Sequence, residues 1–127
     1  MISIIFIILA GICNAVMDII QFKFQGSVFI KFPKLKQWAD PKLSWRNKWK
    51  DGDPSQGERF FLSSTVFVWT TDLWHFAQSF MISFFVLAAI FYNPIFNYII
   101  DFIILKIVFS LSFELFWGHI FLNKNFK

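Results

Sequence analysis

Cysteine and charge are scarce in this chain, and both shortages exclude classes of protein. The single cysteine, Cys13, excludes an intrachain disulfide. Charged residues make up only 16% of the 127 residues and hydrophobic residues 57%, so the chain lacks the charged surface that a water-soluble domain of this size needs. No basic residue precedes the apolar start of the chain, which is unlike a cleaved signal peptide. The composition therefore predicts a membrane protein.

The apolar residues gather in three blocks, 1–22, 60–92 and 94–122. Each block reaches the roughly 20 residues that a helix needs to cross the hydrocarbon layer, and the alternation typical of a transmembrane barrel is missing. We therefore predict a single all-α integral membrane domain with three transmembrane helices. A basic, Trp-rich interfacial segment, 23–59, joins the first two helices, and residues 123–127 form a polar tail.

The basic residues indicate an orientation for these helices. Nine of the twelve Lys and Arg residues lie in 23–59, Lys124 and Lys127 lie in the tail, and the turn at Asn93-Pro94 has none. Loops rich in Lys and Arg stay in the cytoplasm. We therefore expect the N-terminus outside, the C-terminus in the cytoplasm, and a location in a bacterial inner membrane.

The basic segment has the composition of a membrane–water interface. Trp38, Trp45 and Trp49 alternate with basic residues, and Trp and Lys are the usual anchors at such an interface. We expect short helices on the cytoplasmic leaflet, attracted to anionic lipids by about 1 kcal/mol per basic residue, and no nucleic-acid partner. A sharper hypothesis is a site for a phosphate-bearing headgroup, with the ligands Arg46, Lys48, Lys50 and Arg59.

Ionisable groups inside the second block are the strongest functional lead. Asp72 and His75 stand within 60–92, and such groups within a membrane span are costly and commonly functional. The run Ser63-Ser64-Thr65 predicts the start of the helix, because hydroxyl groups cap free amides. A helical wheel then gives one polar arc, made up of Ser64, Thr65, Thr71, Asp72, His75, Gln78 and Ser79.

The other two blocks carry polar groups at a matching depth. Asn14, Asp18 and Gln21 share one face of the first helix, and Glu114 lies in the cytoplasmic part of the third. Lys106 is expected to pair or to extend toward the interface. We predict a polar pocket that opens toward the cytoplasmic leaflet, lined by Asn14, Asp18, Thr71, Asp72, His75, Gln78, Ser79 and Glu114.

Three hypotheses account for this polar cluster. Interhelical hydrogen bonds, worth about 0.6 kcal/mol each, could hold the three helices together. A divalent metal could bind the i, i+3 pair of Asp72 and His75, with Asp18 or Glu114 completing its shell. Alternatively, His75, oriented by Asp72 or Asp18, could act as a general acid or base on a lipid headgroup.

Four stretches carry a resemblance to a known group of proteins. They are Cys13-Asn14-Ala15-Val16-Met17-Asp18, Trp45-Arg46-Asn47-Lys48-Trp49-Lys50-Asp51-Gly52, Phe60-Phe61 with Ser63-Ser64-Thr65, and Thr71-Asp72-Leu73-Trp74-His75. In these motifs the chain resembles a group of short, uncharacterised integral membrane proteins of AT-rich Bacteroidetes-type bacteria and their phages. The resemblance covers roughly residues 13–75. It implies a membrane protein but no activity, cofactor or partner.

Two functions remain open at this point. The first is an accessory or interaction subunit of a larger membrane complex, or a homo-oligomer, that docks through the intramembrane polar face. The alternative is a small membrane enzyme that acts on an anionic phospholipid or its headgroup at the cytoplasmic leaflet, with Asp72 and His75 at its centre. The first predicts a polar face covered by another chain. The second predicts an open pocket and loss of activity on His75→Ala with the fold intact.

Overall fold

The computed structural model describes residues 2–126, and within that range the chain consists of helices, turns and two isolated bridges. The predicted all-α class is confirmed. The long helices are α1 (Ile2–Lys23), α4 (Leu73–Ile90) and α5 (Tyr98–Leu115), which continues as a π-helix (Phe116–Phe121). The short α-helices are α2 (Lys36–Ala39) and α3 (Pro41–Ser44). The 3-10 turns are Phe24–Gly26, Val28–Lys31, Pro33–Leu35, Trp45–Lys48, Lys50–Gly52, Pro54–Gln56, Val68–Thr70 and Lys124–Phe126.

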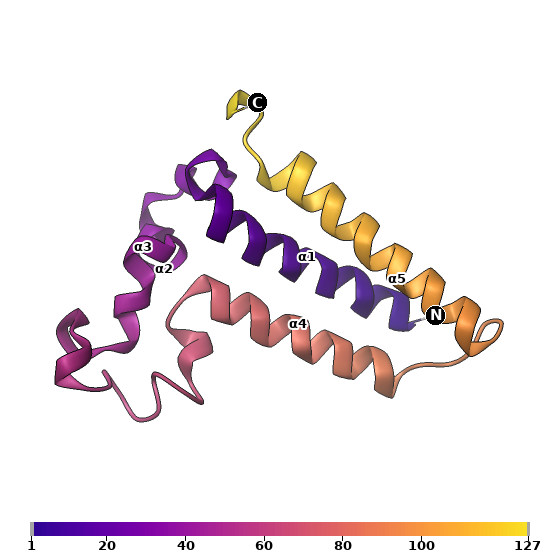
Figure 1. The fold of residues 1–127 in the computed structure, drawn as a ribbon, viewed down its shortest axis with the longest axis horizontal. Coiled ribbons are helices and arrows are strands. Elements are labelled where there is room, and N and C mark those ends of the chain that lie inside the picture. The colour runs from indigo at the N-terminus through magenta and orange to yellow at the C-terminus, as the bar shows by residue number, and fades with distance from the viewer. Residues whose placement is uncertain (1, 127) are drawn as a thin grey trace.

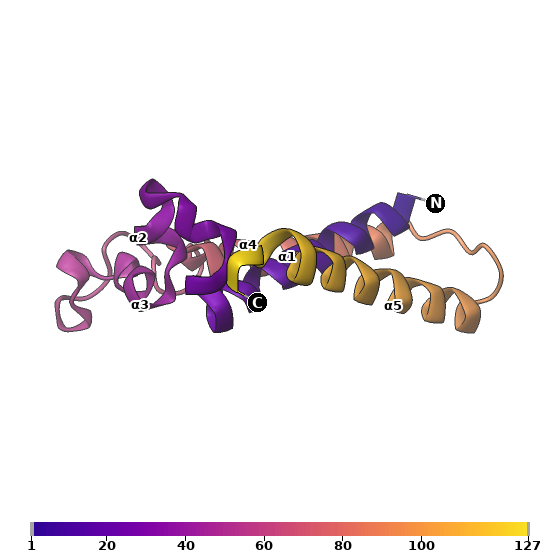
Figure 2. The same cartoon turned by 90° about the horizontal axis from the view of Figure 1, so that it is seen from above.

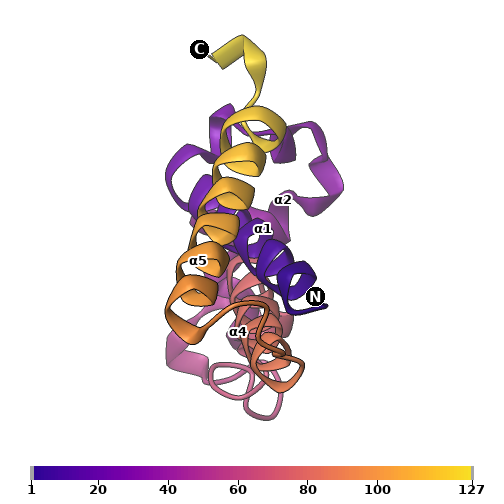
Figure 3. The same ribbon diagram turned by 90° about the vertical axis from the view of Figure 1, so that its right-hand side faces the viewer.

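Helix α1 lies between the other two long helices and packs against both (Figure 1). Seen along the bundle, α1 lies beside α5 and above α4 (Figure 3). The basic segment occupies one end of the bundle, and the N-terminus and the α4–α5 loop occupy the other (Figures 1 and 2). The C-terminal tail meets the basic end, where the amide of Asn123 donates to the carbonyl of Gly26 at 2.7 Å.

Two stretches among residues 2–126, Ile2–Gly26 and Leu73–Ile90, are long and apolar enough to cross a membrane. Only 11% of the Leu73–Ile90 stretch is buried within the protein, so most of its apolar surface is left to the surroundings. Helix α5 is long enough but carries more charge than such a stretch, because its 18 residues include Asp101, Lys106 and Glu114. The structure therefore shows an all-helical chain with two candidate membrane spans.

Helices α1 and α5 approach each other closely at Gly11. A Cβ atom at this position would lie 2.8 Å from the carbonyl oxygen of Phe109 and would overlap the hydroxyl of Ser112. Ser112 is buried, and its hydroxyl donates to that same Phe109 carbonyl at 2.8 Å. A small residue at the crossing lets the backbones approach closely, as is common where membrane helices pack. The contact therefore requires glycine.

The second long helix begins at Leu73 and not near Ser63, so the predicted helix start and the helical wheel are wrong for residues 60–71. Leu62 has a left-handed φ of 56°, which interrupts a right-handed helix. The hydroxyl of Ser63 donates to the carbonyl of Lys48 at 2.7 Å and caps no helix of its own. Residues 60–71 therefore turn back over the basic segment.

Glu58 holds the start of this turn. Its carboxylate accepts hydrogen bonds from the amides of Leu62 at 3.0 Å and Ser64 at 3.1 Å, and from the Ser64 hydroxyl. The hydrogen bond from the Ser64 side chain is the largest cause of the lowered pKa of Glu58, because it stabilises the charged form. The turn thus depends on an ionised carboxylate.

The basic segment folds into short helical pieces, as predicted, and then doubles back. Asp51 and Gly52 have left-handed φ values of 51° and 72°, which reverse the chain. Across the reversal, the amide of Lys50 donates to the carbonyl of Gly57 at 3.0 Å. The short helical pieces confirm the local prediction, whereas a position on a membrane surface stays a prediction.

Asp101 organises the connection between α4 and α5. Its buried carboxylate accepts from the hydroxyl of Tyr92 at 2.8 Å and from the amides of Ile95 at 2.9 Å and Phe96 at 3.2 Å. The third helix accordingly starts at Tyr98, a few residues later than the predicted span at 94. Asp101 has a structural role that the sequence did not reveal.

Candidate functional site

Asp72 and His75 form a directly bonded pair at the first turn of α4. Asp72 is the N-cap residue with extended backbone angles, φ −154° and ψ 158°, and one carboxylate oxygen accepts from the amide of His75 at 2.9 Å. The other oxygen lies 2.7 Å from Nδ1 of the His75 ring. The Asp72 side chain is 5% exposed and the His75 side chain 30% exposed. The carboxylate is therefore buried behind an imidazole ring that is still accessible.

This position corrects the predicted depth of the pair. A helix over the predicted span 60–92 would place both residues well inside it, but they lie at the end of α4 nearest the basic segment. The reason is that residues 60–71 are not helical, so Asp72 meets free amides at the true start of the helix. The pair thus lies at the border between the long helices and the basic segment.

Hydrogen bonds from the basic segment fix the start of α4. The side-chain amide of Asn47 donates to the carbonyl of Thr71 at 2.8 Å and to that of Gln37 at 2.9 Å. The indole of Trp38 donates to the carbonyl of Thr70 at 3.3 Å. These bonds connect residues 37–38, Asn47 and residues 70–71, which come directly before Asp72. They therefore hold the Asp72–His75 pair in one arrangement.

The imidazole of His75 opens into a shallow pocket of about 300 Å³. The pocket is walled by the end of α1, by α3 and the turn after it, and by the start of α4, and Gln21 accepts from the Trp74 indole across it at 2.9 Å. Lys48 is the basic residue among those that line it. The full set of lining residues is Gln21, Pro41, Ser44, Trp45, Lys48, Asp72, Trp74 and His75.

The predicted headgroup ligands do not form one group. Lys48 lines the His75 pocket, whereas Arg46 and Arg59 line a separate pocket of about 370 Å³ that also includes the carboxylate-bearing Asp51. Lys50 is exposed. Of the four predicted ligands, Lys48 is therefore the one that the fold brings to His75.

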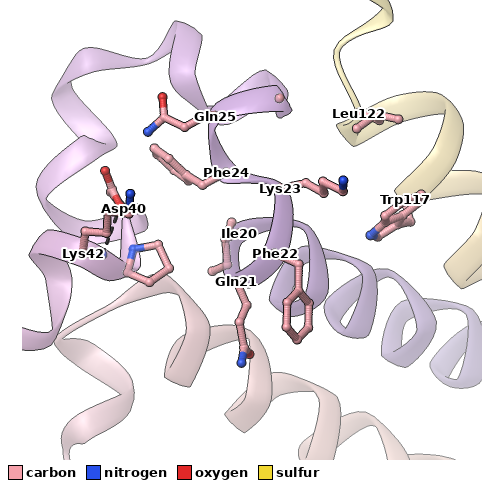
Figure 4. Close-up of a pocket in the computed structure, with 12 residues that line it drawn as sticks. Ile20, Gln21, Phe22, Lys23, Phe24, Gln25, Asp40, Lys42, Trp117 and Leu122 are labelled. Atoms are coloured by element: carbon pink, nitrogen blue, oxygen red, sulfur yellow. Dashed lines mark hydrogen bonds between the residues drawn. The ribbon is translucent and has the colours of Figure 1, made fainter. Parts of the chain in front are cut away.

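A larger pocket of about 480 Å³ adjoins the His75 pocket, and Gln21 and Pro41 line both (Figure 4). It lies between the end of α1, the turn leading into α3, and the π-helix. Its lining is mostly apolar and includes Ile20, Phe22, Phe24, Trp117 and Leu122, with Lys23, Asp40 and Lys42 at polar positions. A larger, mostly apolar cavity thus lies next to the pocket that holds His75.

The remaining predicted residues lie elsewhere. Asn14 and Asp18 are partly buried on α1, and no hydrogen bond or ion pair joins either side chain to another within residues 2–126. Gln78 and Ser79 are partly buried further along α4. Glu114 is exposed on α5 and does not join the cluster. The common pocket expected from three helices is therefore reduced to the Asp72–His75 pair and its new neighbours.

The metal hypothesis needs a third ligand beside the pair. Within the described part of the chain, no three His, Cys, Asp or Glu residues lie close enough together to hold a metal ion. Asp18 and Glu114 are not brought to Asp72 and His75. A carboxylate bonded to Nδ1 instead holds the ring in the orientation that a general acid or base requires.

Several residues at the site escaped the sequence analysis. In the sequence, Asn47 stands only within a motif and Gln21 only on a shared helix face. In the structure, Gln21 joins the site to α1 and Asn47 joins it to the basic segment. The capping role of Asp72 could have been found, because an Asp directly before an apolar helical run is a common helix start. Searches of protein-family models, curated proteins and solved structures find no match to this chain.

Proposed function

We propose that this protein is a small three-span membrane enzyme that binds an anionic phospholipid at the cytoplasmic surface and acts on its headgroup. The observation that carries the proposal is the buried Asp72 carboxylate, 2.7 Å from the His75 ring, in a pocket that Lys48 also lines. A histidine oriented by a buried carboxylate is a recurring acid–base unit. The N-terminus outside and the basic segment inside remain part of the same proposal.

The neighbouring pockets suggest how a lipid would be held. Lys48 offers a cation for the phosphate, and Arg46 and Arg59 add positive charge nearby. The apolar cavity that shares Gln21 and Pro41 with the His75 pocket can take part of an acyl chain. A polar head and an apolar tail would therefore find adjoining surfaces.

The simplest reaction that the pair supports is hydrolysis of a headgroup ester. Nε2 of His75 accepts a proton from water as the water oxygen bonds to the ester centre. The same nitrogen then donates that proton to the leaving oxygen as the ester bond breaks. The Asp72 carboxylate holds the ring through Nδ1 while the proton is on Nε2, and the enzyme ends as it began.

The test uses the full chain in nanodiscs of phosphatidylglycerol and phosphatidylcholine, with lipid products followed by mass spectrometry. We expect turnover of the anionic lipid to fall about 100-fold or more in His75→Gln, in line with the usual contribution of a general acid or base. Lys48→Gln should mainly raise KM. Lys31→Gln removes the same charge from an exposed part of the basic segment and should change little.

Circular dichroism of each variant separates lost chemistry from lost structure. The proposal fails if no anionic phospholipid is turned over above an empty nanodisc. It also fails if His75→Gln, with its helical signal unchanged, keeps full activity.

A further inference from the structure

Helix α5 carries a polar stripe that no other part of the described chain covers. Lys106, Ser110 and Glu114 follow one another at intervals of four residues, and all three are exposed. Residues at this spacing share one face of a helix. No ion pair joins Lys106 or Glu114 to another side chain within residues 2–126.

The stripe faces away from the rest of the bundle. Ser112 and Asp101 are buried, and Ser112 meets α1 at Gly11. At 100° per residue, the stripe is rotated by roughly 120° to 200° from Ser112 around the helix axis. The α1 contact and the polar stripe therefore occupy opposite sides of α5.

Lipid is a poor environment for such a stripe. At 1.5 Å per residue, Lys106 lies about 12 Å and Glu114 about 24 Å along the helix from Tyr98. A charged side chain near the membrane centre costs about 2.5–3.5 kcal/mol on insertion scales. Together with Asp101, these two charges are the reason that α5 is not among the candidate membrane spans. The cost falls when opposite charges cover both groups.

We propose that the Lys106–Ser110–Glu114 stripe binds a transmembrane helix of another protein, with a carboxylate facing Lys106 and a cationic side chain facing Glu114. This inference rests on the three-span topology proposed above but not on the chemistry of His75. A second copy of the chain fits poorly. The basic residues gather at one end of the bundle and give every copy the same orientation, so symmetric pairing would place like charges together.

The probe is a synthetic Leu/Ala transmembrane peptide with one Glu and one Lys eight residues apart. Energy transfer between the labelled full chain and labelled peptide is measured in phosphatidylcholine vesicles. We expect binding at least tenfold tighter than for an all-apolar peptide. In Lys106→Glu the stripe has two carboxylates, so the preference should switch to a peptide with two lysines.

The control variant is Lys124→Glu, which makes the same charge change in the exposed tail and should leave the peptide preference unaltered. Equal binding of charged and apolar peptides would overturn the proposal, as would a Lys106→Glu variant without a switch. Ser110→Cys in cell membranes tests the remaining occupant. A dimer crosslinked through that cysteine would show that a second copy covers the stripe and would also overturn it. These outcomes leave the His75 assay unaffected.

Discussion

Replacing Asp72 should destabilise the protein through two separable effects. Asp72 caps α4 through the His75 amide, and loss of such a cap to alanine costs about 1 kcal/mol, with a range of 0.5–2. The second carboxylate oxygen bonds the His75 ring, and a hydrogen bond to a charged group contributes about 1.5–3 kcal/mol. We therefore expect Asp72→Ala to lower the free energy of unfolding by about 2–5 kcal/mol.

Asp72→Asn separates these effects, because asparagine caps a helix as well as aspartate but has no charge. This variant should keep the cap and lose only the charged bond to His75, so its loss should be smaller than that of Asp72→Ala. Unfolding is followed by circular dichroism as sodium dodecyl sulfate is added to mixed micelles. The Asn97 side chain caps α5 by accepting from the amides of Ile99 and Ile100. Asn97→Ala therefore gives the reference for the loss of a cap alone.

The comparison can refute the reasoning. If Asp72→Ala costs no more than Asn97→Ala, the bond between the carboxylate and the His75 ring adds nothing to stability. If Asp72→Asn costs as much as Asp72→Ala, the helix cap is not part of the effect. The first result would remove the energetic argument that Asp72 holds His75 in a fixed orientation. The second would remove the capping part of the estimate and leave the bond to His75 as the whole effect.

Two further predictions concern other contacts. Gly11→Ala should cost about 1–3 kcal/mol, the usual penalty of overpacking, since the added Cβ meets a backbone carbonyl of α5. The same micelle titration measures this loss. Ala10→Gly is the control and should cost less, and an equal or larger cost would show that the α1–α5 crossing does not lie at Gly11. The folded-state pKa of Glu58 is lowered, so its contribution to stability is present above its ordinary value of 4.5 and is lost as pH falls through the folded pKa. Between pH 7 and pH 3, the free energy of unfolding should fall more steeply for the native chain than for Glu58→Gln. Parallel curves would contradict a stabilising role of the Glu58 carboxylate in the turn.

The helical class and the apolar blocks could be predicted because they depend on composition over long stretches. A run such as Ile2–Phe22 has no other stable form in an apolar environment, where every backbone group needs an internal partner. The short helical pieces of the basic segment could also be predicted, since Pro33, Pro41 and the Asp51-Gly52 pair act locally.

The start of α4 could not be predicted from the apolar run, because distant contacts decide it. Residues 60–71 have no charged residue and join the apolar run of the helix that follows, and Ser63 resembles a cap. In the structure, the Ser63 hydroxyl donates to the Lys48 carbonyl, and the Asn47 side-chain amide donates to the Thr71 carbonyl. Tertiary hydrogen bonds of this kind override local propensity.

The sequence alone determined that Asp72 and His75 lie within one helical turn of each other, because they are three positions apart and that spacing is local. Only the tertiary structure decided their depth, their neighbour Lys48 and the absence of Asp18 and Glu114 from their bonds. It also turned Lys106, Ser110 and Glu114 away from the bundle. Helical spacing tells which side chains share a face, but the packing of α1 between α4 and α5 sets where each face points.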